Sequence, residues 1–171
     1  DEKRRDEKLC PTIIQCGFPR SVTIPAIAAT TVSRTFTVTS LNLDTSCLCN
    51  PNIKLEFASN IIVESGTFTG TVSFQVFKQC KNQITPVLVG PSWTFAADGL
   101  ANGSASTFTF FVCDNDSCFD NCCTYTVVAT IISATTTAPI NVNNATLGAI
   151  ATCESNKCHK KCHERHDEKY Y

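Results

Sequence analysis

The sequence predicts an all-β protein, an antiparallel β-sandwich of the jelly-roll or Greek-key type with about eight to ten strands. We expect an extended N-terminal segment before this sandwich and a polar C-terminal tail after it. Two observations support the prediction. Apolar and polar residues alternate with period two in short runs rich in Val, Ile, Phe and Thr. Turn-forming residues separate these runs, and helical periodicity is almost absent before residue 150.

The predicted strands follow from the alternating runs. In chain order they are residues 20–25, 34–41, 53–58, 67–79, 85–89, 93–96, 106–113, 124–133 and 139–143. Gly, Pro, Asn and Asp favour turns, and they mark the predicted breaks at Asp44-Thr45-Ser46, Asn50-Pro51-Asn52, Gly90-Pro91-Ser92, Asp98-Gly99 and Asn102-Gly103.

Alternation also assigns the two faces of each strand, because neighbouring residues point to opposite sides. The apolar members of each run are expected to face the core, where the aromatic rings pack together. The Thr and Ser residues between them are expected to face outward. The predicted inward set is Val22, Ile24, Phe36, Val38, Leu55, Phe57, Phe68, Val72, Phe74, Val76, Val87, Val89, Trp93, Phe95, Phe108, Phe110, Val112, Tyr125, Val127 and Ile131.

The distribution of charge divides the chain of 171 residues into a connector at 1–19, a body at 20–152 and a tail at 153–171. Residues 1–8 are all charged and the tail holds nine more charges, which leaves twelve charged residues over 9–152. The formal net charge of −1 argues against a nucleic-acid partner, which requires a strong basic excess. No apolar run approaches the roughly 18 residues of a membrane-spanning helix.

Twelve cysteines are the main chemical feature of the sequence, and such a number is typical of an oxidising or metal-rich setting. If Tyr125 faces the core, strand parity sends Cys123 inward and Cys122 outward. The same count sends Cys113 outward. Cys113 and Cys122 flank the connection DNDSCFDN, so they could lie opposite one another within disulfide reach, or each could bond a neighbouring chain.

The remaining cysteines lie in the N-terminal segment, at turns and strand ends, and in the tail. Their number leaves the connectivity open. Cys80, Cys118, Cys123 and Cys153 are the candidates for disulfides within one subunit.

A metal site is most plausible in the tail, where Cys and His recur four residues apart and could share one side of a short helix. The residues are Cys158, His159, Cys162, His163 and His166, and zinc is the metal they suit. The competing interpretation is tail disulfides beside solvated histidines. The acidic loop with Asp114, Asn115, Asp116 and Asp120 lacks the glycine of a calcium loop, and Tyr125 stands where its glutamate belongs. Apart from zinc in the tail, we expect no cofactor.

Catalysis is not expected. All three histidines lie in the tail, so no nucleophile in the body has a base near it in sequence. The chain has no Gly-x-Ser-x-Gly elbow, no Gly-rich phosphate loop, and no Cys-x-x-Cys at the start of a helix.

Several stretches carry a resemblance to a known family. They are CGFPRSVTIPA, TSLNLDTSCLC, IKLEFASNII, GPSWTF, TFTFFVCDNDSCFDNCCTYTVVAT and NNATLGAIATC. Over about residues 9–153 the chain resembles a family of Cys-rich proteins of unassigned function from anaerobic spore-forming bacteria. In general design it is also similar to the endospore appendage subunits of aerobic spore-formers. Those are β-jelly-roll proteins whose Cys-bearing N-terminal connectors tie stacked subunits into fibres through intersubunit disulfides.

The likeness to appendage subunits implies roles for individual cysteines. Cys10 and Cys16 would lie on a connector that reaches a neighbouring subunit. The candidate acceptors on the body are Cys47, Cys49, Cys113 and Cys122. The appendage connectors carry adjacent cysteines, whereas Cys10 and Cys16 are six positions apart and the adjacent pair lies in the body. Which cysteine is the donor and which the acceptor therefore stays open.

These features together predict a structural subunit that assembles with itself, head to tail, into a disulfide-stabilised filament. An extended segment such as PTIIQC can add a strand to the open edge of a neighbour, and a heterologous contact of this kind propagates. The cysteines favour an extracellular place, on a cell or spore surface. The alternative is a secreted, monomeric β-sandwich that binds sugar or metal and has only internal disulfides.

Overall fold

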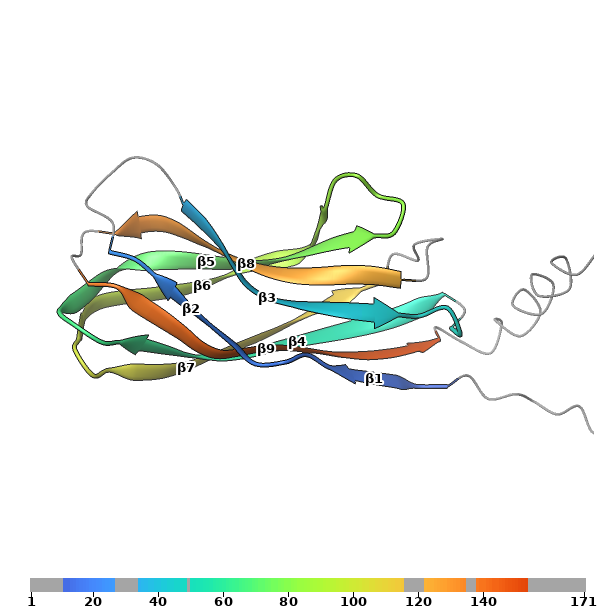
Figure 1. Ribbon diagram of the computed structural model, residues 1–171, viewed down its shortest axis with the longest axis horizontal. Helices are drawn as coiled ribbons and strands as arrows, with labels where there is room; N and C mark the ends of the chain where they lie inside the picture. The colour runs from blue at the N-terminus through green and yellow to red at the C-terminus, as the bar shows by residue number, and fades with distance from the viewer. Residues whose placement is uncertain (1–10, 27–33, 49, 116–121, 135–137, 154–171) are drawn as a thin grey trace, which may run out of the picture.

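The computed structural model describes residues 11–26, 34–48, 50–115, 122–134 and 138–153, and this part of the chain forms two antiparallel sheets packed face to face (Figure 1). The strands are β1 (Ile13–Cys16), β2 (Arg20–Ile24), β3 (Arg34–Asp44), β4 (Pro51–Val63), β5 (Thr67–Cys80), β6 (Val87–Ala101), β7 (Ala105–Asp114), β8 (Cys122–Ala134) and β9 (Ile140–Cys153). The predicted all-β sandwich is confirmed. None of the described residues forms a helix long and apolar enough to cross a membrane.

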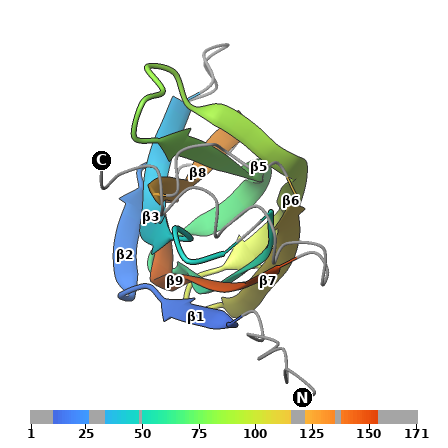
Figure 2. The ribbon, with the colours of Figure 1, turned by 90° about the vertical axis from the view of Figure 1, so that its right-hand side faces the viewer.

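The order of the strands is that of a jelly roll. One sheet, here called the first sheet, has the order β1-β9-β4-β7, with β2 also paired to β9, and the second sheet has the order β3-β8-β5-β6. Strands therefore pair as if one long hairpin, turning between β5 and β6, had been rolled up. Figure 2, which looks along the roll, shows the two layers enclosing the core.

The core lies between the sheets and consists of the residues that alternation predicts. Every member of the predicted inward set except Val87 is buried or packs against the core. Val87 is 43% exposed because it begins the edge strand β6. Phe57, Phe74 and Phe110 pack against one another across the centre with tilted rings, whose centroids are 5.9 Å apart for Phe57–Phe74 and 4.9 Å for Phe57–Phe110. Such pairs add about 0.5–1.5 kcal/mol each beyond the area they bury.

Two predicted turns prove to be irregularities inside one strand. β6 runs without a break through Gly90-Pro91-Ser92 and Asp98-Gly99, and its register against β5 shifts near both. Gly90 has φ of +68° and Gly99 +70°, a conformation that favours glycine at bulges. Pro91 is tolerated because β6 is an edge strand, on which a missing N–H need not break a ladder.

The N-terminal segment and the last strand are more regular than the sequence indicates. β1 lies within the predicted connector, and in this chain it pairs with β9 of the same body. β9 continues to Cys153, well beyond the predicted strand at 139–143. Its inward residues include Ala145, Ala149 and Ala151, whose small side chains contrast too little with their neighbours to give a strong alternation.

Candidate assembly site

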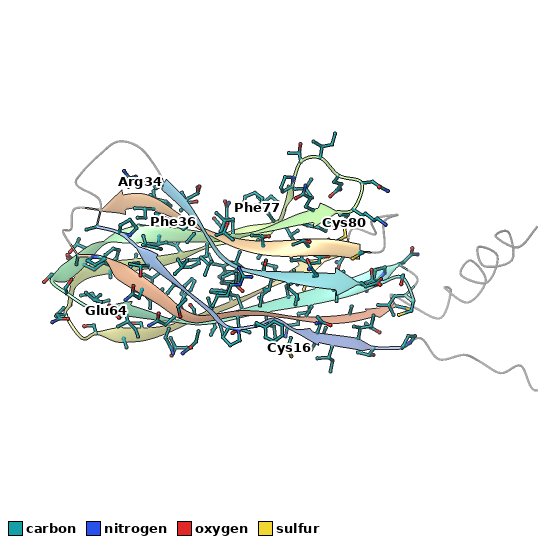
Figure 3. All side chains as sticks on the ribbon, viewed as in Figure 1. Cys16, Arg34, Phe36, Glu64, Phe77 and Cys80 are labelled. Atoms are coloured by element: carbon teal, nitrogen blue, oxygen red, sulfur yellow. A yellow bond between two sulfur atoms is a disulfide. The ribbon has the colours of Figure 1, made fainter. Side chains whose placement is uncertain are left out.

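All cysteines of the described residues except Cys16 gather at one end of the sandwich, where β1 begins, β9 ends, and the connections β3–β4, β5–β6 and β7–β8 lie. We call this the cysteine end. It carries Cys47, Cys80, Cys113, Cys122, Cys123 and Cys153 among the described residues. The described residues that join strands at the opposite end, 25–26, 64–66, 102–104 and 138–139, include no cysteine. Figure 3 labels Cys80 at the cysteine end and Glu64 at the opposite end.

A disulfide joins Cys80 at the end of β5 to Cys123 at the start of β8. The two residues are direct partners in the antiparallel register, with their Cα atoms 4.0 Å apart, so they form a cross-strand bridge. Both side chains are buried, which agrees with the inward direction predicted for Cys123. Cys153 at the end of β9 is also disulfide-bonded.

Cys113 and Cys122 face outward, as strand parity predicts, but the structure does not bring them together. β7 pairs with β4 in the first sheet, whereas β8 pairs with β3 and β5 in the second. The connection between the two cysteines therefore crosses from one sheet to the other instead of closing a hairpin. Their side chains lie on opposite outer faces of the sandwich, and both thiols are exposed and unpaired.

Two further thiols are exposed and unpaired in the described part of the chain. Cys47 lies in the turn between β3 and β4. Asp44 precedes that turn, and the Ser46 backbone amide donates a hydrogen bond of 2.9 Å to its Oδ1. This hydrogen bond, with a second one from the Ser46 side chain, lowers the pKa of Asp44 below its ordinary value. Cys16 ends β1 opposite Gly148 of β9, and Figure 3 places it on the outer margin of the first sheet.

β1 is attached to the body by few contacts. It pairs only with β9, lying end to end with β2 along the same edge of that strand. Only Ile13 is partly buried, while Ile14 is 70% exposed. The following segment, Gly17 to Pro19, contributes one backbone hydrogen bond, from the Gly17 N–H to the Leu147 carbonyl at 2.9 Å, and its Phe18 is 86% exposed.

The outer face of the first sheet carries exposed apolar side chains between two thiols. Register places Ile14 beside Ile150, and Ile150 beside Lys54, which is the partner of Cys113. Phe111, 53% exposed, lies on the same face with the Lys54 ammonium 5.2 Å from its ring centroid. Apolar side chains on this face therefore lie between Cys16 at one margin and Cys113 at the other.

One polar cluster escaped the sequence analysis. Lys78 of β5 and Asp114 of β7 form a buried ion pair, and their side chains are 3% and 5% exposed. The Tyr125 hydroxyl of β8 donates a hydrogen bond of 2.7 Å to Asp114 Oδ2. A signal was present in the sequence, because Lys78 occupies an inward position between Val76 and Cys80 of the alternating run.

The described residues contain no group of three or more His, Cys, Asp or Glu side chains that could hold a metal ion. The calcium-loop interpretation included Asp116 and Asp120, which lie outside the described residues, as do Cys10, Cys49 and Cys118. The zinc candidates of the tail, Cys158, His159, Cys162, His163 and His166, also lie outside them.

Among solved structures, the chain is similar to several β-rich proteins at low sequence identity. The match to a structure of infectious bursal disease virus Gx strain covers 83% of this chain and 36% of the viral chain, with 9% identity and a TM-score of 0.48. The match to Eiger TNF from S. frugiperda covers 82% of this chain and 92% of the TNF chain, with 7% identity and a TM-score of 0.45. The match to a carbohydrate-binding module of the β-sandwich superfamily covers 82% of this chain and 58% of the module's chain, with 9% identity and a TM-score of 0.35.

Sequence comparison places the chain more firmly than these structural likenesses do. A search of curated proteins found no match. A family profile, in contrast, matches residues 10–152, which include all nine strands described above except the last residue of β9. The protein therefore belongs to the family described as "Domain of unknown function (DUF4489)".

Proposed function

We propose that this protein is a structural subunit that assembles head to tail into a disulfide-linked filament. In the filament, β1 of one subunit occupies the edge of β9 on the next subunit. The only partner required is the chain itself. The Cys-rich composition supports a place outside the cell, on a cell or spore surface, where thiols become oxidised, and the resemblance in design to endospore appendage subunits is consistent with that proposal.

The observation that carries the proposal is the set of exposed, unpaired thiols. Cys16, Cys47, Cys113 and Cys122 all face solvent, although the same chain protects other cysteines in disulfides. In an oxidising setting, exposed thiols that cannot reach one another within a subunit pair between subunits. They lie on both outer faces and in a turn, so neighbours can be linked from more than one side.

Exchange of β1 solves a geometric problem of head-to-tail assembly. Because the described residues at the end opposite the cysteine end include no cysteine, direct stacking would bring thiols against residues that have no thiol to accept them. A donated β1 carries Cys16, and Cys10 shortly before it, onto the neighbour's β9, which runs to the neighbour's cysteine end. A donated Cys16 takes the same outer margin of the first sheet that it holds in its own subunit, so its acceptor thiol comes from a further subunit, whereas Cys10, six positions earlier, is carried toward the cysteine end of the neighbour that holds β1.

Because β1 makes few contacts with its own body, its withdrawal costs little free energy. Withdrawing it uncovers one partly buried side chain and the β9 edge at residues 148–151. An identical strand from a neighbour restores the same contacts, so the exchange itself costs little free energy. The exposed Ile14, Ile150 and Phe111 provide further apolar surface for contact between subunits.

Electrophoresis after boiling in detergent, with and without reductant, tests the proposal. We expect a ladder or material too large to enter the gel without reductant, and a monomer band with it. Replacing Cys10→Ser and Cys16→Ser together should leave a folded sandwich and shorten the fibres seen by negative-stain electron microscopy. The matched control, Cys80→Ala with Cys123→Ala, removes an internal bridge and should keep the ladder.

The outcomes separate the two candidate functions. A monomer band in both lanes contradicts covalent assembly. If the monomer is also monodisperse with all twelve cysteines paired, the secreted binding module is the better description. Fibres of unchanged length and detergent resistance in the Cys10→Ser/Cys16→Ser variant contradict the role of the N-terminal segment.

A further inference from the structure

The buried ion pair between Lys78 and Asp114 has an unusual setting. Lys78 Nζ lies 2.8 Å from Asp114 Oδ2 and 3.0 Å from Oδ1, and the two side chains come from different sheets. With the amine this close to both oxygens, it lies within about 3.3 Å of the carboxyl carbon, which is the separation of about 3–3.5 Å expected of groups poised to react. Water is excluded, since both side chains are almost completely buried.

We propose that Lys78 and Asp114 condense to an intramolecular amide, an isopeptide bond between β5 and β7. This proposal does not depend on the proposed filament. It concerns a covalent modification that the protein makes on its own side chains, without a cofactor or a second protein.

The reaction begins with a proton transfer within the pair. Moving one proton from the ammonium to the carboxylate yields a neutral amine and a neutral carboxylic acid, and a low-dielectric interior penalises charged groups more than neutral ones. The neutral Nζ has a lone pair and is the nucleophile, and the carbon of the protonated carboxyl group is the electrophile.

The reaction balances without an oxidant or reductant. The Lys78 Nζ attacks Asp114 Cγ, which forms the C–N bond and places negative charge on the carboxyl oxygen. The Tyr125 hydroxyl already donates a hydrogen bond to Oδ2 and stabilises this charge as it develops. The C–O bond to the hydroxyl group then breaks, one Nζ proton passes to that hydroxyl, and one water leaves. The amine and the carboxylic acid become one amide, with no change in charge.

The product suits the site better than the ion pair does. A neutral amide avoids the cost of burying two charges. The bond would link the two sheets at the cysteine end, beside the disulfide that links β5 to β8. The second Lys–carboxylate pair of the described residues, Lys54–Glu56, provides an internal comparison. Its side chains are 45% and 55% exposed, so water reaches both groups and the pair should not condense.

The mass of the purified full-length protein, reduced and alkylated, tests the proposal. We expect it to be lighter by one water than the sequence requires. Peptide sequencing by tandem mass spectrometry should place the linkage between Lys78 and Asp114. The variant Lys78→Arg keeps a positive charge opposite Asp114, but its guanidinium is always protonated and is not a nucleophile. It should regain the full mass, and Lys54→Arg should remain one water lighter.

The wild-type measurement is decisive even if a variant fails to fold. If the folded wild-type protein has the full mass that its sequence requires, with no water lost, the proposal is overturned. A loss of water that maps to other residues also overturns it. Tyr125→Phe removes the hydrogen bond to Oδ2 while leaving the amine and the carboxyl group in place. We expect slower or incomplete loss of water in that variant, and an unchanged rate would overturn the role given to Tyr125.

Discussion

The disulfide between Cys80 and Cys123 should contribute about 4 kcal/mol to the free energy of unfolding. The two cysteines are 43 residues apart in sequence. Closing a loop of that length removes roughly 13 cal/mol/K of entropy from the unfolded chain, which is about 4 kcal/mol at room temperature. The perturbation is the double variant Cys80→Ala/Cys123→Ala, which removes the bridge without leaving a buried thiol.

Urea unfolding is the appropriate assay. With an m value of about 2 kcal/mol/M, the midpoint should fall by roughly 2 M. The matched control is Cys113→Ala, an exposed and unpaired cysteine whose replacement should change stability by no more than about 0.5 kcal/mol. A loss below about 1 kcal/mol in the double variant would refute the reasoning.

The proposed amide sharpens this prediction. A bond between Lys78 and Asp114 shortens the path from Cys80 to Cys123 in the unfolded chain to about a dozen residues, and the contribution of the disulfide falls to about 3 kcal/mol. The same disulfide removal should therefore cost about 1 kcal/mol more in a Lys78→Arg background. Equal costs in the two backgrounds would argue that no amide is present.

Three further predictions concern single features. Lys78→Met removes the ammonium that faces the buried Asp114 carboxyl group and should cost about 3–5 kcal/mol in urea unfolding, whereas adding Asp114→Leu should make the loss smaller. Gly17→Ala places a Cβ 2.7 Å from the Leu147 carbonyl oxygen, so hydrogen exchange should accelerate in β1 and stay unchanged in β4. Because the pKa of Asp44 is lowered in the folded state, its stabilising effect is present above the ordinary value of 3.8 and disappears as the pH falls through the folded-state value. In thermal melts, Asp44→Asn should therefore be less stable than wild type at neutral pH and equal to it in strong acid.

Strand parity explains how much of the fold was predictable. In a two-layer sandwich each strand has one buried face and one solvent-exposed face, so alternation identifies the core residues without any knowledge of the strand order. It also separates the adjacent pair, with Cys123 turned into the core and Cys122 turned to solvent.

Sheet membership was not predictable in the same way. The connection after Cys113 crosses to the other sheet, and nothing in the residues Asp114–Asn121 distinguishes such a crossing from a hairpin loop. In a jelly roll the pairing partners lie far apart in sequence, so local patterns do not encode them. For this reason the bridge from Cys80 to Cys123 emerged only from the register.

The features that could not be predicted from the sequence are those that depart from the alternation of apolar and polar residues. Lys78 interrupts an apolar run at an inward position, and the partner that makes this tolerable, Asp114, lies on another sheet. β1 was missed for a different reason. It has only four residues and one partly buried side chain, so its pairing depends on the edge of β9 and not on a pattern of its own.

A disulfide map of mixed isotope-labelled chains tests the central claim, that subunits are joined through their cysteines, most directly. Light and heavy chains are reduced, mixed, allowed to assemble and oxidise, and digested without reductant. We expect disulfide-linked peptide pairs containing Cys16 in which one peptide is light and the other heavy, while the Cys80–Cys123 pair stays all light or all heavy. If in every disulfide-linked peptide pair both peptides are light or both are heavy, the subunits are not covalently joined and the account is contradicted.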